Sequence, residues 1–195
     1  MSRIVFIRHT ATDMAGRFCG HSDPDLNATG EEQLRHLLDE IAPLGIERIF
    51  SSDLLRARRV AEAIASHYEA ELYFRSTLRE ISFGEWESME WSEIQSRFPE
   101  QAQRWLIGFP LEAAPGGESY ESFTTRVALE LQTIVCEQDK SVTAIVTHRG
   151  VMQFALARFF SIPAAETWQR TARYGAVVSV EFDEALCALT QEITR

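Results

Sequence analysis

Three features are scarce in this chain of 195 residues: long apolar runs, cysteine and positive charge. No apolar run approaches the roughly 18 residues of a membrane-spanning helix, so we expect no membrane span. The three cysteines are odd in number and widely spaced, and no CxxC pair occurs. That pattern is typical of reduced thiols, so it predicts a cytoplasmic protein.

Positive charge is in deficit, because 19 Lys and Arg residues stand against 29 Asp and Glu residues, for a net charge of −10. An acidic chain repels phosphate backbones and anionic lipid, so we expect neither nucleic acid nor a membrane as partner. Arginines that gather at one point of such a chain would indicate a site for an anion. Composition is otherwise ordinary, and the length predicts a single domain over residues 1–195.

Several catalytic signatures are absent. No cysteine is followed six residues later by an arginine, which argues against a cysteine phosphatase. No GxxxxGKS/T, GxSxG or HExxH pattern occurs, which argues against P-loop, α/β-hydrolase and zinc-peptidase chemistry. Asp23-Pro24-Asp25 lies deep in a loop, so it matches the metal-dependent aspartyl phosphatases poorly. We therefore expect no metal and no cofactor.

Short apolar strands alternate with amphipathic helices along most of the chain. Strands are predicted at 4–7, 48–50, 71–74 and 142–146, and helices at 30–41, 54–68, 119–138 and 151–160. Thr29 and Glu32 have the spacing of a capping box, so Thr29 is the expected N-cap of the first helix. Segments 176–182 and 186–193 predict an edge hairpin. The pattern predicts an α/β fold, a three-layer α/β/α sandwich around a mostly parallel sheet.

Residues 78–118 break this alternation. They are rich in aromatics, with short helical patterns at 90–97 and 100–106 and with Pro and Gly near their end. We interpret this segment as an inserted lid whose aromatics form a core of its own rather than a platform for stacking bases. The sequence leaves open whether exposed lid aromatics contact substrate or a second copy of the chain in a homodimer.

Reactive side chains follow the two strands that are most clearly buried. His9 follows the first strand and His148 follows the fourth. Parallel strands end at the same edge of a sheet, so both histidines, with Arg8, are expected there. Arg56 lies near the start of the helix after the second strand, and that helix N-terminus faces the same edge.

Such a group can hold phosphate, because guanidinium and backbone N–H donors match its oxygens. A neutral imidazole can attack phosphorus, with arginines offsetting charge in the transition state. The departing alcohol needs a proton, and Glu80 at the start of the lid is the candidate donor. In a plainer interpretation, Glu80 simply acts as a cap or pairs with Arg79. Arg58 and Arg59 are expected on a solvated helix face.

Six segments, in order, resemble motifs of the histidine phosphatase superfamily, which has the phosphoglycerate-mutase-like fold. IRHT over 7–10 resembles its RHG signature, and VTHRG over 146–150 resembles VxHxG. The other matching segments are DLNATG over 25–30, SSDLLRA over 51–57, LREISFGEWE over 78–87 and GES over 117–119. The resemblance covers nearly the whole chain, so it implies that fold with a small lid.

The resemblance implies a role for each member of the predicted site. His9 is implied as the phosphorylated nucleophile and Glu80 as the proton donor. The implied phosphate pocket is completed by Arg8, Arg56 and His148. Cys19 and Gly20 match a position where members of the family touch substrate.

Three departures from the family pattern stand out. Thr10 replaces the usual glycine, and its N–H and hydroxyl can still bind phosphate. Arg149 replaces a small residue or glutamine after the second histidine, and the loop over 11–16 is short. The RHT form, the short loop and the FGEWE segment resemble the α-ribazole-phosphate phosphatase branch, which serves assembly of the cobalamin nucleotide loop.

The implied function is metal-independent hydrolysis of a small phosphomonoester through a phosphohistidine. α-Ribazole 5′-phosphate is the first candidate substrate. One alternative is a broad-specificity phosphatase or a phosphoglycerate-mutase-type phosphotransferase of the same fold. A more remote one is an inactive protein that binds a phosphorylated ligand, which the intact set of site residues argues against.

Overall fold

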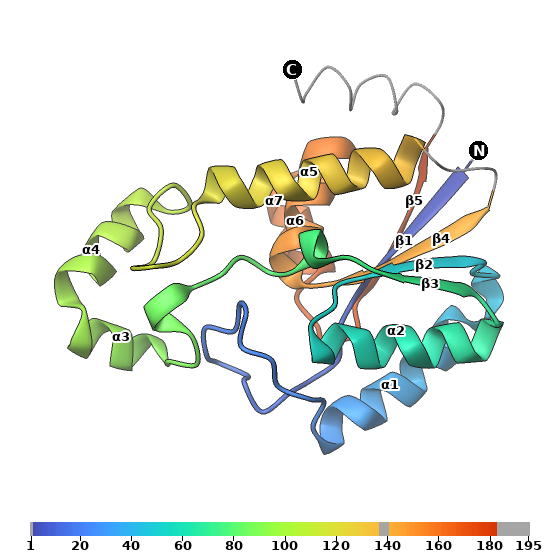
Figure 1. Ribbon diagram of the computed structural model, residues 1–195, viewed down its shortest axis with the longest axis horizontal. Coiled ribbons are helices and arrows are strands. Elements are labelled where there is room, and N and C mark those ends of the chain that lie inside the picture. The colour runs from blue at the N-terminus through green and yellow to red at the C-terminus, as the bar shows by residue number, and fades with distance from the viewer. Residues whose placement is uncertain (1, 137–140, 183–195) are drawn as a thin grey trace.

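The computed structural model describes residues 2–136 and 141–182 (Figure 1). Its strands are β1 (Ser2–Arg8), β2 (Arg48–Ser51), β3 (Glu71–Phe74), β4 (Val142–Thr147) and β5 (Val177–Phe182). Its α-helices are α1 (Ala28–Ile41), α2 (Leu55–Tyr68), α3 (Trp91–Arg97), α4 (Pro99–Gly108), α5 (Tyr120–Cys136), α6 (Arg149–Phe159) and α7 (Ala164–Arg170). Short 3-10 helices cover Ala42–Leu44, Ser76–Leu78 and Gly84–Trp86.

The described strands form one mostly parallel sheet, in the order β3-β2-β4-β1-β5. Only β5 runs antiparallel to its neighbour in this sheet. Arg8 is opposite Thr147 in the register, so β1 and β4 end level with each other, directly before His9 and His148. The prediction of a mostly parallel sheet is confirmed. The second strand of the predicted hairpin, 186–193, lies outside the described residues.

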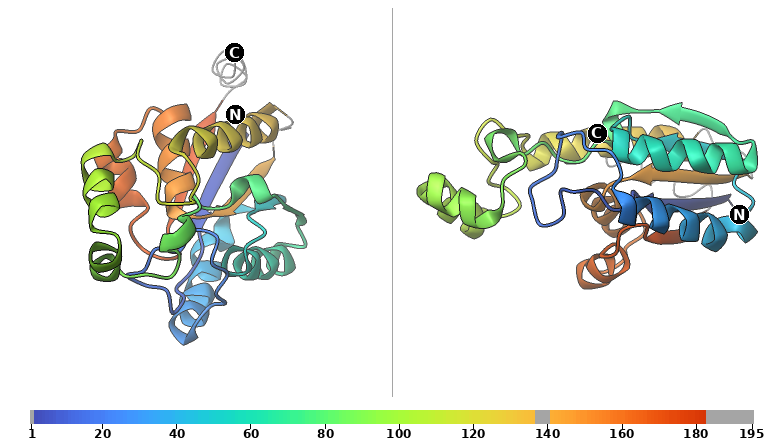
Figure 2. Two further views of the ribbon diagram at one scale, coloured as in Figure 1. Left: turned by 60° about the vertical axis from the view of Figure 1, so that its left-hand side comes forward. Right: turned by 90° about the horizontal axis from the view of Figure 1, so that it is seen from below.

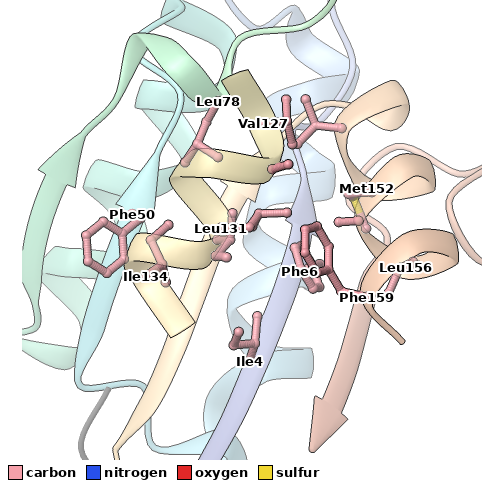
Figure 3. Close-up of a cluster of buried hydrophobic side chains, with 14 of the residues drawn as sticks. Ile4, Phe6, Phe50, Leu78, Val127, Leu131, Ile134, Met152, Leu156 and Phe159 are labelled. Carbon is pink, nitrogen blue, oxygen red and sulfur yellow. The ribbon is translucent and has the colours of Figure 1, made fainter. Parts of the chain in front are cut away.

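Helices cover both faces of the sheet (Figure 2), which confirms the three-layer prediction. Side chains alternate across a strand, so Val5 and Ile7 pack with α1 and α2, while Ile4 and Phe6 pack with α5 and α6 (Figure 3). All four side chains are fully buried, which is why β1 is apolar at every position from 4 to 7. This burial holds β1 rigidly in the interior and thereby fixes the position of His9, which directly follows the strand.

The first helix begins differently from its sequence prediction. Its N-cap is Asn27, whose side-chain oxygen accepts a hydrogen bond from the Gly30 N–H at 2.9 Å. Asparagine is a stronger cap than threonine, so the prediction of Thr29 is wrong by two residues. The α7 helix was not predicted.

The segment predicted to be a lid, residues 78–118, is called the lid below and carries α3 and α4 beyond the ends of the parallel strands (Figure 1). A separate apolar cluster holds it together, built on Trp86 and Ile94, which are both fully buried. Phe18, from the loop after β1, packs into this cluster, and its N–H donates to the Met89 carbonyl at 2.9 Å. The prediction of a lid core is therefore confirmed, while Phe109 is 63% exposed.

The cysteines differ from their predicted state. Cys19 is a free, half-buried thiol. Cys136 is disulfide-bonded, so the prediction of reduced thiols is wrong there, because sequence spacing does not show which side chains meet in space. Cys187 lies outside the described residues, and a cytoplasmic location stays a prediction. Within 2–136 and 141–182, no helix combines the length and apolarity needed to cross a membrane.

Candidate active site

A cavity of about 1160 Å³ lies between the sheet edge and the lid. It is lined by β1, the loop after β1, the lid, α6 and α7. Four predicted site residues belong to its lining: Arg8, His9, Cys19 and Glu80. Four others contribute no lining surface: Thr10, Gly20, Arg56 and His148.

His9 lies at the end of β1 with its ring buried. Its Nδ1 is 2.8 Å from the Thr10 carbonyl oxygen. A carbonyl only accepts hydrogen bonds, so this contact assigns the proton to Nδ1 and leaves a free lone pair on Nε2. Burial and the charges of Arg56 and Arg8 lower the pKa of His9 well below its usual 6.5, against the opposing effect of the Thr10 bond. His9 is therefore neutral near pH 7.

His148, the N-cap residue of α6, faces His9 with ring centroids 5.2 Å apart. Burial, followed by the charge of Arg56, also lowers the pKa of His148 well below 6.5. Its Nε2 is 2.8 Å from the Ser52 Oγ, while its buried Nδ1 finds no partner among the described residues. Ser52 lies in the SSDLLRA motif, but no sequence pattern indicates this contact.

Arg56 is 1% exposed, and its guanidinium ties α2 to the loop after β1. Its Nη1 donates to the Ser22 carbonyl at 2.6 Å, and its Nη2 donates to the Gly20 carbonyl at 2.7 Å. The buried Nε makes no hydrogen bond within 2–136 and 141–182. Arg56 thus links α2 to the loop after β1 and also places a positive charge beside both histidines.

Arg8 is half-buried, and its guanidinium lies over the Tyr174 ring, 4.2 Å from the centroid. Its Nη1 donates to the carbonyls of Thr171 at 3.1 Å and Ala172 at 2.6 Å. Tyr174 also contacts His9, with ring centroids 5.7 Å apart. No motif marks Tyr174, so its position became clear only from the fold.

Glu80 is 9% exposed and bridges the lid to α6. Its carboxylate accepts from the Ile81 N–H at 3.0 Å and from the Gly150 N–H at 2.9 Å. The Gly150 bond places the carboxylate at the positive N-terminal end of α6. A Cβ at Gly150 would lie 2.3 Å from Glu80 Oε1, so glycine is needed there. Arg79 pairs with Asp53 at 2.6 Å, so the predicted pairing of Glu80 with Arg79 is wrong. The alternative that Glu80 acts as a cap is confirmed by its bond to the Gly150 N–H in the first turn of α6.

Arg126 in α5 braces the start of the lid, a role that the sequence analysis missed. Its guanidinium donates to the carbonyls of Thr77, Arg79 and Glu80 at 2.8, 2.8 and 2.9 Å. It also forms an ion pair with Glu118 at 2.7 Å. Glu118 belongs to the GES motif, which was the available signal.

Glu87 joins the lid to the loop after β1 and was also missed. It accepts from the N–H groups of Gly20, His21 and Ser22 at 3.1, 2.8 and 3.0 Å. Burial raises the pKa of Glu87, but hydrogen bonds, led by that from the Ser22 hydroxyl, outweigh it and hold the pKa below its usual value. A Cβ at Gly20 would lie 2.1 Å from the Ile81 carbonyl oxygen, which explains the glycine.

Thr10 and Cys19 contact the site through their carbonyl groups, which accept from His9 and Arg56. Thr10 is fully buried, and its Oγ1 has no partner in the described part of the chain. Burial raises the pKa of the Cys19 thiol, which lies 3.9 Å from the Ser22 carbonyl oxygen. The substrate contacts of Thr10, Cys19 and Gly20 stay predictions.

Comparisons with known proteins agree with this geometry. A model of the histidine phosphatase superfamily (branch 1) matches residues 4–192. Adenosylcobalamin/alpha-ribazole phosphatase of Salmonella typhimurium is 25% identical over 189 residues, 96% of this chain and 94% of that protein. The Escherichia coli O1:K1 protein named "Probable phosphoglycerate mutase GpmB" is 29% identical over 189 residues, 95% of this chain and 87% of its own.

A solved structure shows the same phosphoglycerate-mutase-like fold. Alpha-ribazole phosphatase from Shigella flexneri matches with a TM-score of 0.85 and 24% identity, over 93% of this chain and 91% of that one. The chain therefore belongs to branch 1 of the histidine phosphatase superfamily and is an enzyme of the phosphatase class.

Proposed function

We propose that this chain hydrolyses a small phosphomonoester through a phosphohistidine intermediate on His9. The observation that carries the proposal is the tautomer of His9. Its Nδ1–H is held by the Thr10 carbonyl, so the neutral ring offers the Nε2 lone pair in a cavity wall that also holds Arg8 and Glu80. A neutral, oriented imidazole is the form that attacks phosphorus.

In the first half-reaction, His9 Nε2 attacks phosphorus, the N–P bond forms and the bond from phosphorus to the ester oxygen breaks. Glu80 gives its proton to the departing alcohol. The guanidinium groups of Arg8 and Arg56 offset the charge on the equatorial oxygens. If the Ser52 hydroxyl donates to Nε2 of His148, the unpartnered Nδ1–H of His148 is the atom that donates to phosphate.

In the second half-reaction, water attacks the phosphorus of phospho-His9 and gives its proton to Glu80. The N–P bond breaks, inorganic phosphate leaves, and neutral His9 is restored. The two N–H donors from Ile81 and Gly150 hold the Glu80 carboxylate in one orientation. A fixed orientation suits a group that donates a proton to the alcohol oxygen and later accepts one from water at the same position.

The first substrate that we propose is α-ribazole 5′-phosphate. Its support is the likeness to a relative named for that activity and the resemblance of the FGEWE segment. We propose a single domain in which the lid, residues 78–118, covers the cavity. A phosphoglycerate-mutase-type transfer is the second candidate, favoured by the likeness to the protein named GpmB.

The test is kcat/KM in EDTA for α-ribazole 5′-phosphate beside phosphoserine, 3-phosphoglycerate and an aryl phosphate. A large preference for α-ribazole 5′-phosphate supports both the mechanism and the substrate. Weak and equal rates would keep the mechanism and withdraw the substrate. A phosphoenzyme that survives for many minutes and passes its phosphoryl group to phosphoglycerate would favour the mutase. An absolute need for added metal would overturn the phosphohistidine mechanism.

A further inference from the structure

One cation of the cavity wall, Arg149, is held by an aromatic ring and by no hydrogen bond or ion pair among the described residues. Arg149, the first residue of α6, lines the cavity together with Glu80 and Tyr174. Its guanidinium lies over the ring of Trp168 in α7, 3.7 Å from the centroid. Across the described residues 2–136 and 141–182, its side chain makes no hydrogen bond or ion pair, and its Nε is buried. Trp168 therefore holds the guanidinium by one face only.

This position is electrostatically unfavourable for a cation. The N-terminus of α6 carries a partial positive charge, which repels the Arg149 guanidinium. Burial lowers the pKa of Arg149, and its charge also lowers the pKa of Arg8 in the same wall. Arg17, another arginine of the cavity wall, forms an ion pair with Glu90 at 2.8 Å. Arg149 thus differs from Arg17 in forming no ion pair among the described residues, although the charge of Glu80 opposes the effect of burial on its pKa.

The surroundings of Arg149 indicate which part of a ligand would reach it. Glu80, the proposed proton donor to the alcohol oxygen, is bonded to the N–H of Gly150, the residue next to Arg149. Both residues line the cavity, and Glu80 is the charge that acts most strongly on Arg149, so the guanidinium lies near the proposed proton donor, on the side of the alcohol. A guanidinium fork matches a carboxylate in both geometry and charge, one to one.

We infer that Arg149, supported by Trp168, forms a subsite for a carboxylate on the alcohol part of the substrate. The inference rests on the proposed function and adds a substrate class to it. α-Ribazole 5′-phosphate has no carboxylate on its alcohol. Among the proposed substrates the subsite therefore favours those that have one, such as 3-phosphoglycerate, over that first candidate. It also gives a purpose to the arginine that stands where the family has a small residue or glutamine.

The experiment compares 3-phosphoglycerate with glycerol 3-phosphate, which has a hydroxymethyl group in place of the carboxylate. Calorimetry gives the Kd of both esters for the full chain in the His9→Gln background, where neither ester is consumed. Arg149→Gln, Arg149→Lys and Trp168→Leu are then added singly. Arg158→Gln is the matched control, because Arg158 lies on the same helix and lines the same cavity but is exposed.

We expect 3-phosphoglycerate to bind at least about tenfold more tightly than glycerol 3-phosphate, because a charge-assisted fork adds to its binding. Arg149→Gln should bring this ratio near one, Arg149→Lys should restore part of it, and Trp168→Leu should lower it by about threefold. Arg158→Gln should leave the ratio unchanged. The Arg158→Gln control also tests whether another cation of the cavity wall contributes to the preference for the carboxylate ester.

Three results would overturn the subsite: a ratio near one without any change at Arg149, an equal loss for both esters in Arg149→Gln, or an equal loss of the ratio in Arg158→Gln. These binding results do not depend on turnover. Failure of the proposed function would appear separately, as a chain with native His9 that hydrolyses no ester.

Discussion

The two sides of the cavity are built differently. At the sheet edge, the neutral rings of His9 and His148 are buried, and Arg56 is locked by backbone carbonyls at 2.6 and 2.7 Å. On the lid side, the wall carries aromatic and apolar side chains, and Phe109 is 63% exposed although it lines the cavity.

This difference separates chemistry from specificity. Groups that handle a transferred phosphoryl must be held within fractions of an ångström, and buried strand ends with satisfied backbone bonds provide that rigidity. Groups that select the alcohol need only shape and a few charges, which an inserted segment can supply. Changes to the groups at the sheet edge should therefore lower turnover of every ester. Changes on the lid side, or at the proposed subsite of Arg149, should lower it for some esters only.

The largest effect is expected from His9→Gln, which removes the proposed nucleophile. Turnover of every ester should fall by about 10⁴-fold or more, as when other nucleophiles are removed. Steady-state kinetics with an aryl phosphate measures it. His36→Gln is the matched control, because His36 is exposed on α1. A His9→Gln enzyme within tenfold of the native rate would contradict the assignment.

Arg8→Gln should lower kcat/KM by about 10²–10³ for all esters alike, because one donor to the transition state is lost. Arg58→Gln serves as its control, since Arg58 pairs with Glu62 on the surface as predicted, and should change the rate by less than about twofold. A loss confined to one ester would place Arg8 in specificity rather than chemistry.

Gly150→Ala tests the contact between Glu80 of the lid and the first turn of α6. The added Cβ would lie 2.3 Å from Glu80 Oε1, so the carboxylate must move away from the leaving alcohol. We expect about 10- to 100-fold loss in kcat, which would be smaller for an aryl phosphate because its leaving group needs less protonation. Equal loss on alkyl and aryl esters would argue against Glu80 as the acid.

The lid side should respond more weakly and selectively. Phe109→Ala should lower kcat/KM by about three- to tenfold for α-ribazole 5′-phosphate and less for a small alkyl phosphate, because apolar contact with a large alcohol is lost. Leu111→Ala is the control, since Leu111 is exposed but does not line the cavity. An equal loss of kcat/KM for both esters would contradict the assignment of specificity to the lid side.

The smallest effect concerns stability against pH. Both buried histidines have pKa values lowered well below 6.5, so the unfolded chain binds more protons as the pH falls below that value. Their contribution to the free energy of unfolding is complete above pH 6.5 and falls by at most about 1.4 kcal/mol per pH unit and histidine below it. In urea unfolding, His148→Gln should show a shallower slope between pH 6.5 and 5, and His36→Gln an unchanged one.

The same division explains what the sequence could predict. The apolar run from Ile4 to Ile7 predicts a buried strand, because a strand that is covered on both faces needs such a run. Arg8 and His9 follow it at once, so their place at the end of the strand is predicted as well. Glu80 and Arg56 also lie where their motifs predict. These features depend on local spacing and on a parallel sheet, both of which can be predicted from the sequence alone.

Residues whose contacts span long distances in the chain could not be predicted. Tyr174 reaches Arg8 across 166 positions, and Arg126 holds Glu80 across 46, so no local pattern links them. Arg56 was predicted to complete the phosphate pocket, but the carbonyls to which it donates belong to a loop whose path only the fold determines. The N-cap at Asn27 was missed because the capping-box pattern at Thr29 competed with it.

The most direct test of the account is to trap the intermediate. The enzyme is mixed with ³²P-labelled ester in EDTA and quenched in alkali within milliseconds to seconds, and the labelled residue is located by mass spectrometry. The account predicts an acid-labile, alkali-stable phosphoryl group on His9 that forms and decays at rates compatible with turnover, and no label in His9→Gln. Turnover without any label on His9, or label on another residue that persists in His9→Gln, would contradict it.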